Sequence, residues 1–484
     1  MKLEELLRDV EVTELRAPGE LEISDVAYDS RRVTPGAAFV AIRGFESDGH
    51  RYIPQAAEKG AACVICEEKP AADVPYVIVK DSRLALAMVS RNFYRDPGSE
   101  MVLIGVTGTN GKTTTTYLVK HLLEQKRGAT VGLIGTNGNM IGSEFLHTER
   151  TTPESCELQK LLREMADAGC THVVMEVSSH SLVLHRVAGL HFAVGIFTNL
   201  TQDHLDFHKT MDEYARAKSL LFSMCDRAVI NLDDEWSEFM LEHCPCPAIT
   251  FSEGERGDLT AHDIALSSAG VAFTAAYHGA GERVKLGIPG LFSVYNALGV
   301  IGTGLSLGIE LAECADSLAS ARGVKGRVEV VPTDGDYTIL IDYAHTPDAL
   351  ENVLKSMRRV AKGRLVALFG CGGDRDRTKR PIMGRIAAEN ADFVVVTSDN
   401  PRTEQPEAII ADIVAGMEGT STPREVITGR PEAIEWAITN HQPGDVIVLA
   451  GKGHEDYQIV GHEKHHMDER EIVAGILEKR KTDR

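Results

Sequence analysis

The chain has 484 residues, of which 43% are hydrophobic and 25% charged, and its formal net charge at pH 7 is -20. This length exceeds what one hydrophobic core supports, so the composition predicts several domains of an ordinary globular protein. The acidic balance argues against a nucleic-acid-binding surface, but it is compatible with a local basic cleft that binds anionic small molecules.

The first 98 residues mix short strands and helices and predict a small N-terminal α/β domain. Apolar runs indicate strands at 39–42, 62–65 and 76–79, with helices at 52–59 and 84–93. The nine cysteines are scattered among apolar neighbours, so we expect buried free thiols. Cys63 and Cys66 have the spacing of zinc ligands, but no second pair lies nearby, and a strand is favoured over a metal site.

A glycine-rich turn then separates a predicted buried strand, 101–106, from a predicted helix, 113–125. Glycines let backbone N–H groups approach phosphate oxygens, and a helix N-terminus adds positive potential. Within this turn Lys112 can reach a terminal phosphate and Thr113 can bind Mg²⁺. The glycine spacing departs from the common P-loop, and the alternative is a simple turn with a surface lysine. We expect the phosphate-binding loop to comprise Gly108, Thr109, Asn110, Gly111, Lys112, Thr113 and Thr114.

Strands and helices alternate through the rest of the segment 99–332, which predicts a mainly parallel central sheet. The expected strands are 172–176, 193–197 and 228–230, and the expected helices are 155–169 and 211–222. Residues 260–288 resemble inserted antiparallel strands. The stretch 286–309 has no charged residue, but its six glycines and its proline favour a buried helix over a membrane span.

Two segments of this central region carry candidate metal ligands. Glu176 ends a predicted strand, and a carboxylate beside a nucleotide can bind Mg²⁺; the alternative is a buried glutamate paired with a lysine. The segment 199–208 places two histidines and two aspartates after another strand, which favours a metal and phosphate role over a solvated loop. Lys218 follows on a predicted helix and, considered alone, indicates only a surface lysine.

From residue 333 the alternation restarts and predicts a Rossmann-like C-terminal α/β domain. Its expected strands are 337–341, 365–369, 393–396 and 446–449, and its expected helices are 347–360, 406–416 and 430–440. Glycines, arginines and carboxylates follow three of these strands, at 370–376, 399–402 and 451–455. Ligands of open α/β sheets bind at such strand ends, and paired Arg and Glu suit a zwitterion. The alternative is a set of salt bridges that only stabilises the loops.

Taken together, these segments resemble the Mur ligase family. The resemblance rests on Thr107–Thr114, 176–180, 199–208 with Lys218, 342–345 and 399–402, and it extends across essentially the whole chain from Asp29-Ser30-Arg31. It implies three domains: 1–98 for a uridine nucleotide, 99–332 for ATP and 333–484 for an incoming amino acid.

The resemblance also implies site residues. The catalytic set would be Lys112, Glu176, His204 and Lys218, and Mg²⁺ would be held by Thr113, Glu176, His204 and Lys218, the last as a CO₂-derived carbamate. ATP would further contact Asn296, Arg327 and Asp342. The UDP-N-acetylmuramoyl-dipeptide would contact Ser30, Phe45, Glu46, Ser47, Thr151, Thr152, Ser178 and Arg186. Diaminopimelate would contact Arg375, Asp399, Asn400, Pro401, Arg402, Gly451 and Glu455. Leu184 stands where some members of the family have Gln, so that polar contact is not expected.

The activity implied is ATP-dependent addition of meso-2,6-diaminopimelate to UDP-N-acetylmuramoyl-L-alanyl-D-glutamate through an acyl phosphate. We therefore expect a cytoplasmic, monomeric enzyme that acts on small-molecule substrates and uses ATP and Mg²⁺. We expect no nucleic-acid partner and no membrane span. The alternatives within the superfamily are a lysine-adding ligase and a folylpolyglutamate synthase. The alternative from another class, a nucleotide-dependent switch, requires only the phosphate loop and leaves the arginines of the last domain unexplained.

Overall fold

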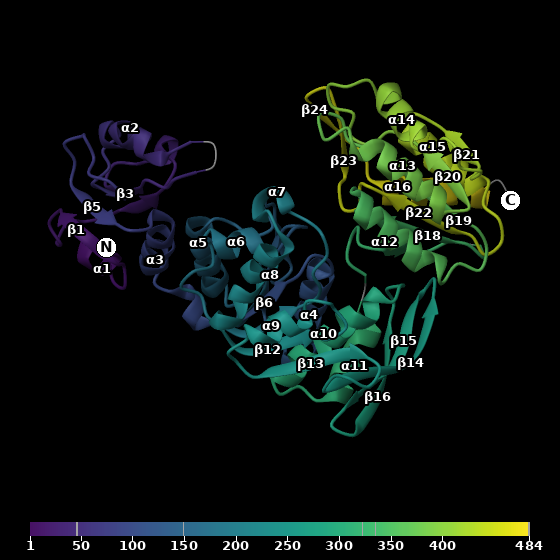
Figure 1. Ribbon diagram of the computed structural model, residues 1–484, viewed down its shortest axis with the longest axis horizontal. Helices are drawn as coiled ribbons and strands as arrows, with labels where there is room; N and C mark the ends of the chain where they lie inside the picture. Colours follow the sequence, from purple (N-terminus) through teal and green to yellow (C-terminus); the bar gives the residue numbers. More distant parts are fainter. Residues whose placement is uncertain (45–46, 149, 322, 334, 483–484) are drawn as a thin grey trace. The chain divides into compact units, whose positions relative to one another are not determined.

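A computed structural model describes residues 1–44, 47–148, 150–321, 323–333 and 335–482 (Figure 1). They form two compact units, and the chain passes between them more than once. Unit 1 comprises Met1–Thr260 and Leu298–Cys314, and unit 2 comprises Ala261–Ala297 and Ala315–Arg484. The boundaries therefore fall inside strand β14 (Leu259–Ser267) and helices α10 (Phe292–Ser306) and α11 (Leu311–Ser320).

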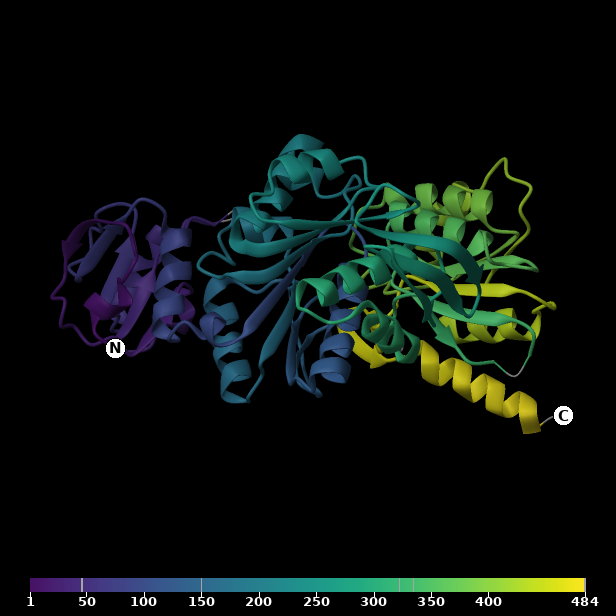
Figure 2. The same cartoon turned by 90° about the horizontal axis from the view of Figure 1, so that it is seen from below.

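The N-terminal sheet of unit 1 has the order β1-β5-β4-β3-β2, and only β1 is antiparallel to its neighbour. Figure 2 shows helix α3 beside this sheet. Helix α3 begins two residues before its predicted start because Asp81 caps it, accepting hydrogen bonds from the N–H groups of Arg83 and Leu84. The elements are α1 (Leu3–Leu6), β1 (Val12–Arg16), β2 (Asp25–Ala27), β3 (Ala37–Val40), α2 (Ile53–Glu58), β4 (Cys63–Cys66), β5 (Tyr76–Val79) and α3 (Ser82–Phe93).

Alternation along β4 explains why Cys63 and Cys66 form no zinc site. Cys63 packs in the cluster with Val40 and Leu86, whereas Cys66 packs with Phe39 in the cluster on the other side. Successive side chains of a strand point to opposite faces, so these two thiols cannot share a metal ion. All nine cysteines are free thiols, and seven are buried, as expected from the sequence.

The central sheet of unit 1 runs in the order β13-β12-β11-β6-β10-β7-β8-β9. Its strands from β13 to β7 are parallel, whereas β8 and β9 pair antiparallel. Its strands are β6 (Val102–Thr107), β7 (Val131–Ile134), β8 (Asn139–Ile141), β9 (Glu144–Leu146), β10 (His172–Glu176), β11 (Phe192–Phe197), β12 (Cys225–Asn231) and β13 (Ala248–Glu253). The helices are α4 (Lys112–Arg127), α5 (Ser155–Asp167), α6 (Ser179–Val183), α7 (Leu205–His208), α8 (Met211–Ser219) and α9 (Ser237–Glu242).

The uncharged stretch forms helix α10, as predicted. Within unit 1, a Cβ added to Gly302 would lie 2.7 Å from Val229, and one added to Gly299 would lie 3.6 Å from Ile196. These glycines let the helix approach the sheet closely, which is a packing role. Across the described residues, we find no helix whose length and apolarity would suffice to cross a bilayer.

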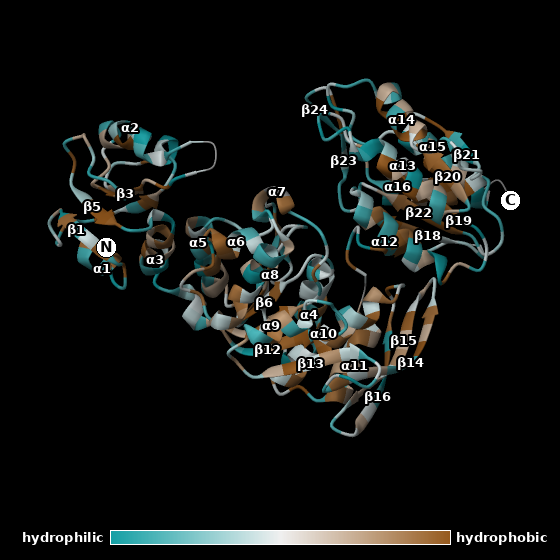
Figure 3. Ribbon diagram, viewed as in Figure 1, coloured by the Kyte–Doolittle hydropathy of each residue, from teal (hydrophilic) through white to brown (hydrophobic). Residues whose placement is uncertain are grey.

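Unit 2 contains most of strand β14, strands β15 (Gly270–Tyr277) and β16 (Ala280–Leu286), and a six-stranded sheet. That sheet runs β17-β18-β22-β19-β20-β21 and is parallel except at β17. Its inner strands, β18, β22, β19 and β20, consist mainly of buried apolar residues, which are brown in Figure 3, and helices pack against them. The strands are β17 (Glu329–Val331), β18 (Thr338–Asp342), β19 (Leu365–Phe369), β20 (Phe393–Val396), β21 (Arg424–Val426) and β22 (Val446–Ala450), and the helices are α12 (Pro347–Arg358), α13 (Lys379–Asn390), α14 (Pro406–Ala415), α15 (Arg430–Thr439) and α16 (Glu469–Thr482).

A two-stranded hairpin, β23 (Tyr457–Val460) and β24 (Glu463–His466), lies outside this sheet. The predicted α/β class is confirmed, and the central parallel sheet with its glycine loop is present. The division at 1–98, 99–332 and 333–484 stays a prediction.

Candidate active site

The glycine loop joins the carboxyl end of β6 to helix α4, as predicted. Gly108 has φ +149° and Gly111 has φ +84°, conformations that favour glycine. The loop is held by the segment after β11: the N–H of Thr109 donates to Asn199 O at 2.9 Å, and Thr198 Oγ1 donates to Asn110 O at 2.7 Å. Thr198 was not identified from the sequence, because its role depends on β11 lying beside β6.

We expect Gly108→Ala to destabilise the protein and weaken ATP binding. The added Cβ would lie 1.9 Å from Thr198 Oγ1, so the hydroxyl that holds the loop must move. Backbone strain of this kind costs about 1–3 kcal/mol. Thermal unfolding and ATP titration measure both effects, with Gly128→Ala as control, because Gly128 also has positive φ but has no atom within 4 Å of an added Cβ. Equal melting temperatures and ATP affinities for the two variants would contradict the prediction.

Glu176 is 1% exposed and lies between two threonines. Thr113 Oγ1 donates to Glu176 Oε1 at 2.9 Å, and Thr136 donates through its N–H at 2.9 Å and its hydroxyl at 3.1 Å. Hydroxyl and carboxylate oxygens are the ligands that Mg²⁺ prefers, and Mg²⁺ usually takes only one or two carboxylates beside phosphates. The residues present therefore fit Mg²⁺ bound together with a nucleotide.

Lys218 is not a surface lysine, contrary to what its segment alone indicates. Its side chain is 1% exposed, its Nζ donates to Gly108 O at 2.7 Å, and the same atom lies 4.4 Å from the centre of the Tyr214 ring. Burial, with the nearby charge of Lys112, lowers the pKa of Lys218 well below its usual value. Lys112 itself folds over the loop, donating to Gly108 O at 3.0 Å and Thr109 O at 2.8 Å.

His204 lies at the more exposed edge of this region. It has φ +52° and its side chain is 47% exposed, with Nε2 3.4 Å from Asp203 Oδ2. Its ring contacts those of His180, at 4.9 Å, and Tyr214, at 6.1 Å. Lys218 and His204 therefore both lie near the ring of Tyr214.

The residues predicted for the dipeptide end also come together, around Thr152. Thr152 Oγ1 donates to Glu176 O at 2.8 Å and lies 3.4 Å from Ser178 Oγ, and Arg186 Nη1 donates to Thr152 O at 3.2 Å. Thr151 Oγ1 lies 3.0 Å from Thr136 Oγ1, and Leu184 is the C-cap residue that follows helix α6.

Arg186 has a buried partner that the sequence did not reveal. Its Nε lies 2.8 Å from Glu154 Oε1, and the same oxygen accepts from Arg150.

Of the residues predicted for uridine binding, Phe45 and Glu46 lie outside the described residues. Ser30 follows β2 and is buried, with Oγ donating to Gln55 at 2.8 Å; Ser47 follows the parallel neighbour β3 and is exposed. Parallel strands end at the same edge of a sheet, so the two segments that carry these serines both begin at that edge.

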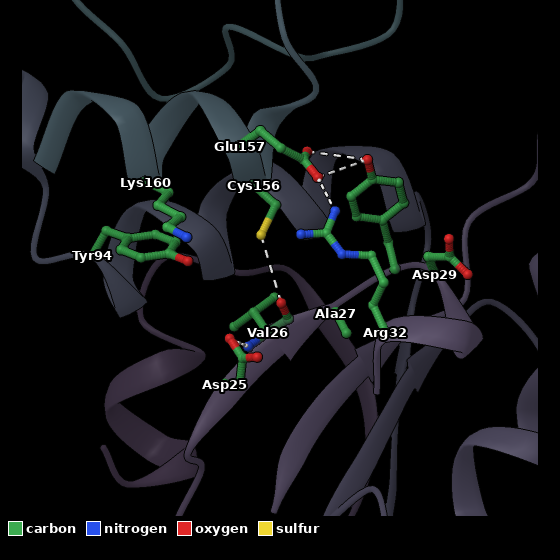
Figure 4. Close-up of a pocket in the computed structure, with 10 residues that line it drawn as sticks. Asp25, Val26, Ala27, Asp29, Arg32, Tyr94, Cys156, Glu157 and Lys160 are labelled. Carbon is green, nitrogen blue, oxygen red and sulfur yellow. Dashed lines mark hydrogen bonds and ion pairs between the residues drawn. The ribbon is translucent and has the colours of Figure 1, made fainter. Parts of the chain in front are cut away.

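A cavity of about 140 Å³ lies elsewhere in unit 1, between the N-terminal sheet and α5 (Figure 4). There Arg32 and Tyr28 both bond to Glu157, and no predicted site residue lines the cavity.

Unit 2 brings Arg327 and Asp342 together. Buried Asp342 accepts hydrogen bonds at 2.8 Å from the N–H groups of Val328 and Ala344. Burial raises the pKa of Asp342, an effect that the charge of Arg327 opposes. The Arg327 guanidinium lies 5.1 Å from the centre of the Tyr343 ring, and Asn296 is buried on α10.

The residues predicted for diaminopimelate gather at the carboxyl ends of β19, β20 and β22. Asn400 Nδ2 donates to Glu455 Oε2 at 3.0 Å, and Arg402 Nη1 donates to Gly373 O at 2.8 Å. Gly451 has φ +112°, and a Cβ there would lie 2.8 Å from Asp399. Pro401 is buried and Arg375 is exposed. Cations and carboxylates thus share one edge of the sheet.

Family models match three successive parts of the chain: "Mur ligase family, catalytic domain" at 22–94, "Mur ligase middle domain" at 106–304 and "Mur ligase, glutamate ligase domain" at 326–453. UDP-N-acetylmuramoyl-L-alanyl-D-glutamate--2,6-diaminopimelate ligase 1 of Clostridium acetobutylicum is 47% identical over 481 residues, covering 99% of both chains. The chain belongs to the Mur ligase family.

Solved structures of Mur ligases have the same fold. A UDP-N-acetylmuramoyl-L-alanyl-D-glutamate--2,6-diaminopimelate ligase superposes with a TM-score of 0.76 at 32% identity, covering 99% of both chains. MurF from Thermotoga maritima, solved in complex with ADP, has a TM-score of 0.59 at 20% identity and covers 95% of this chain and 97% of its own; it supports the fold alone. Membership in this family makes the chain a ligase, and excludes the simple nucleotide switch considered above.

Proposed function

We propose that this Mur ligase joins meso-2,6-diaminopimelate to the D-glutamyl γ-carboxylate of UDP-N-acetylmuramoyl-L-alanyl-D-glutamate, using ATP, in the synthesis of peptidoglycan precursors. The observation that carries the proposal is the cluster of Asn400, Arg402 and Glu455 in a chain 47% identical, over its full length, to a ligase of that name. The two polar ends of an amino acid match a guanidinium and a carboxylate. We expect the enzyme to act as a cytoplasmic monomer.

Amide formation requires an activated carboxyl group. The substrate γ-carboxylate would attack the γ-phosphorus of ATP, and the bond between that phosphorus and the oxygen bridging to the β-phosphate would break. ADP would depart, and the substrate would carry the phosphoryl group as an acyl phosphate. Lys112 would neutralise charge on the transferring group, and the glycine loop would hold the phosphates. Mg²⁺ held by Thr113 and Glu176, with His204 and modified Lys218 nearby, would neutralise further negative charge.

Lys218 would carry a carbamate. A lysine whose pKa is lowered has a larger neutral fraction, and the neutral amine attacks CO₂, forming an N–C bond and releasing a proton. The product is an anionic oxygen ligand in place of a cation. The side chain of Lys218 is 1% exposed, and this burial supports the carbamate, because an unmodified, positively charged lysine buried beside Mg²⁺ would repel the metal ion.

The incoming amine would then attack the acyl carbon, and the tetrahedral intermediate would expel phosphate. Arg402, with Arg375, would bind the distal carboxylate of diaminopimelate, and Glu455 its ammonium group. Thr151, Thr152, Ser178 and Arg186 would hold the dipeptide end of the other substrate, and Ser30 and Ser47 with residues 45 and 46 its uridine end. Arg327, Asp342 and Asn296 would complete the ATP site. Holding the reactants in line supplies much of the acceleration.

Product mass and phosphate release, measured together, test this proposal. With ATP, Mg²⁺ and UDP-N-acetylmuramoyl-L-alanyl-D-glutamate, we expect phosphate release and a tripeptide product only when meso-diaminopimelate is added. Product formed with L-lysine instead would indicate a lysine-adding ligase, and extension of a folate substrate by glutamate would indicate a folylpolyglutamate synthase. Absence of any product with diaminopimelate would refute the proposal.

A further inference from the structure

A lysine that is absent from the predicted site lies between two residues of the proposed diaminopimelate site. The Lys452 side chain is 0% exposed, and its Nζ donates to Glu455 Oε2 at 2.8 Å and to Asn400 Oδ1 at 3.1 Å. Asn400 follows β20 and Lys452 follows β22, so one ammonium group joins the loops of two strands.

The bonds made by Lys452 determine how Asn400 is oriented. Asn400 Oδ1 accepts from Lys452 Nζ and also from the N–H of Ile459 at 2.9 Å. With both donors on the oxygen, the amide nitrogen faces Glu455 and donates to its Oε2.

The carboxylate of Glu455 is oriented as well. Both of its bonds reach Oε2, and Oε1 makes no hydrogen bond to any residue that the structure describes. The side chain of Glu455 is 13% exposed, so it reaches solvent whereas Lys452 does not.

The backbone around Lys452 explains why its side chain points inward. The flanking glycines both have positive φ: an added Cβ would lie 2.8 Å from Asp399 at Gly451 and 2.5 Å from Tyr343 at Gly453. The loop therefore packs closely against its neighbours. A buried ammonium group is costly unless it is paired, and here Glu455 supplies the opposite charge and Asn400 a neutral acceptor.

We propose that Lys452 is a positioning residue for amino-acid recognition: it holds Asn400 and Glu455 in the orientation that leaves Glu455 Oε1 for the ammonium group of the incoming amino acid, without contacting that substrate itself. The inference rests on the proposed function. It predicts that loss of the ammonium group impairs use of diaminopimelate and leaves use of ATP intact.

The test compares Lys452→Met, which keeps an unbranched side chain one atom shorter than lysine and removes its charge, with Lys464→Met. Lys464 is an exposed residue of β24 whose Nζ lies 4.3 Å from the centre of the Tyr457 ring. We expect Lys452→Met to raise KM for diaminopimelate by about 10- to 100-fold, with KM for ATP and for the nucleotide dipeptide within twofold of wild type. Lys464→Met should leave all three constants within twofold.

Two further variants, Glu455→Gln alone and Glu455→Gln combined with Lys452→Met, distinguish a positioning role of Lys452 from a role in folding. In Glu455→Gln the carboxylate that Lys452 holds is gone, so adding Lys452→Met should raise KM for diaminopimelate less than threefold further. The double variant also buries no unpaired charge, so it remains informative if Lys452→Met alone does not fold.

The inference would be overturned by an unchanged KM for diaminopimelate in Lys452→Met, or by an additional increase of tenfold or more in that KM when Lys452→Met is added in the Glu455→Gln background. An equal rise of all three KM values would also overturn it, because that pattern indicates a general structural role. A failure of the proposed function would be distinguishable from a failure of this inference, because the wild-type enzyme itself would then form no tripeptide.

Discussion

Replacing Lys112 by methionine is expected to lower kcat for phosphate release by about 10²–10³-fold, the loss typical of removing one preorganised hydrogen-bond donor to charge that develops in a transition state. Lys112 Nζ now rests on the carbonyl oxygens of Gly108 and Thr109, at the start of α4, where a nucleotide's phosphates would meet it. Methionine keeps the unbranched shape of the side chain, lacks its terminal atom and removes the charge. Phosphate release with all three substrates measures the effect.

Two controls make this result specific to the phosphate loop. Thermal unfolding shows whether losing the two carbonyl contacts alters stability, and Lys80→Met removes an exposed lysine of the N-terminal part, whose side chain is 71% exposed. Turnover of Lys112→Met within threefold of wild type would contradict the assignment of this lysine to the phosphates.

Replacing Arg402 by alanine is expected to reduce kcat/KM for diaminopimelate by about 30- to 5,000-fold. This range corresponds to about 2–5 kcal/mol, the cost of truncating one partner of a buried charge pair. L-Lysine lacks the distal carboxylate that Arg402 would bind. When L-lysine occupies the wild-type site, the Arg402 guanidinium would therefore have no carboxylate partner on the substrate. The alanine variant should therefore also lose most of the preference for diaminopimelate over lysine.

The control for this prediction is Arg385→Ala, which removes an exposed arginine of α13 in the same unit. Because Arg402 also donates to Gly373 O, KM for ATP and the melting temperature are measured alongside. If Arg402→Ala kept wild-type kinetics with diaminopimelate, the assignment of the distal carboxylate to Arg402 would be wrong.

Local sequence patterns predicted the parts of the fold that depend on periodicity. Strand β10 has its predicted bounds, 172–176, because a run of buried apolar residues ends at the carboxylate of Glu176. Helix α13 was not predicted: Gly384 and Pro381 interrupt its pattern, and the glycine is explained only by its approach to α14, where a Cβ would lie 2.1 Å from Ile413 O.

The hairpin β23–β24 was also missed, for a different physical reason. Its tip is polar and exposed, and it is held by distant backbone partners: the N–H of Arg402 donates to Ile459 O at 3.0 Å, and the N–H of Gly461 donates to Arg402 O at 2.8 Å. Contacts of this kind leave no periodic pattern in the sequence.

Motifs identified the candidate site residues, but not the residues that hold them. Glycines and charges after strands pointed to the loop of β6 in unit 1 and to the loops of β20 and β22 in unit 2, and within unit 2 the structure brings the residues after β20 and β22 into contact. Thr136, which holds Glu176, and Arg430 could not be found in this way. Buried Arg430 bonds to Glu469 Oε1 at 2.8 Å and to the carbonyl oxygens of Ser398 and Ala450, yet in sequence it resembles an ordinary exposed helix residue.

The repeated passage of the chain between the two units has a practical consequence for dissecting this enzyme. A fragment that stops at Thr260 would retain most of unit 1 but lose 298–314, including the part of α10 that packs on Ile196 and Val229. Its central sheet would then expose an apolar face to water, and we expect such a fragment to aggregate. Nucleotide binding and amino-acid recognition are therefore best separated by point substitutions in the intact chain, since no single cut yields two independent halves.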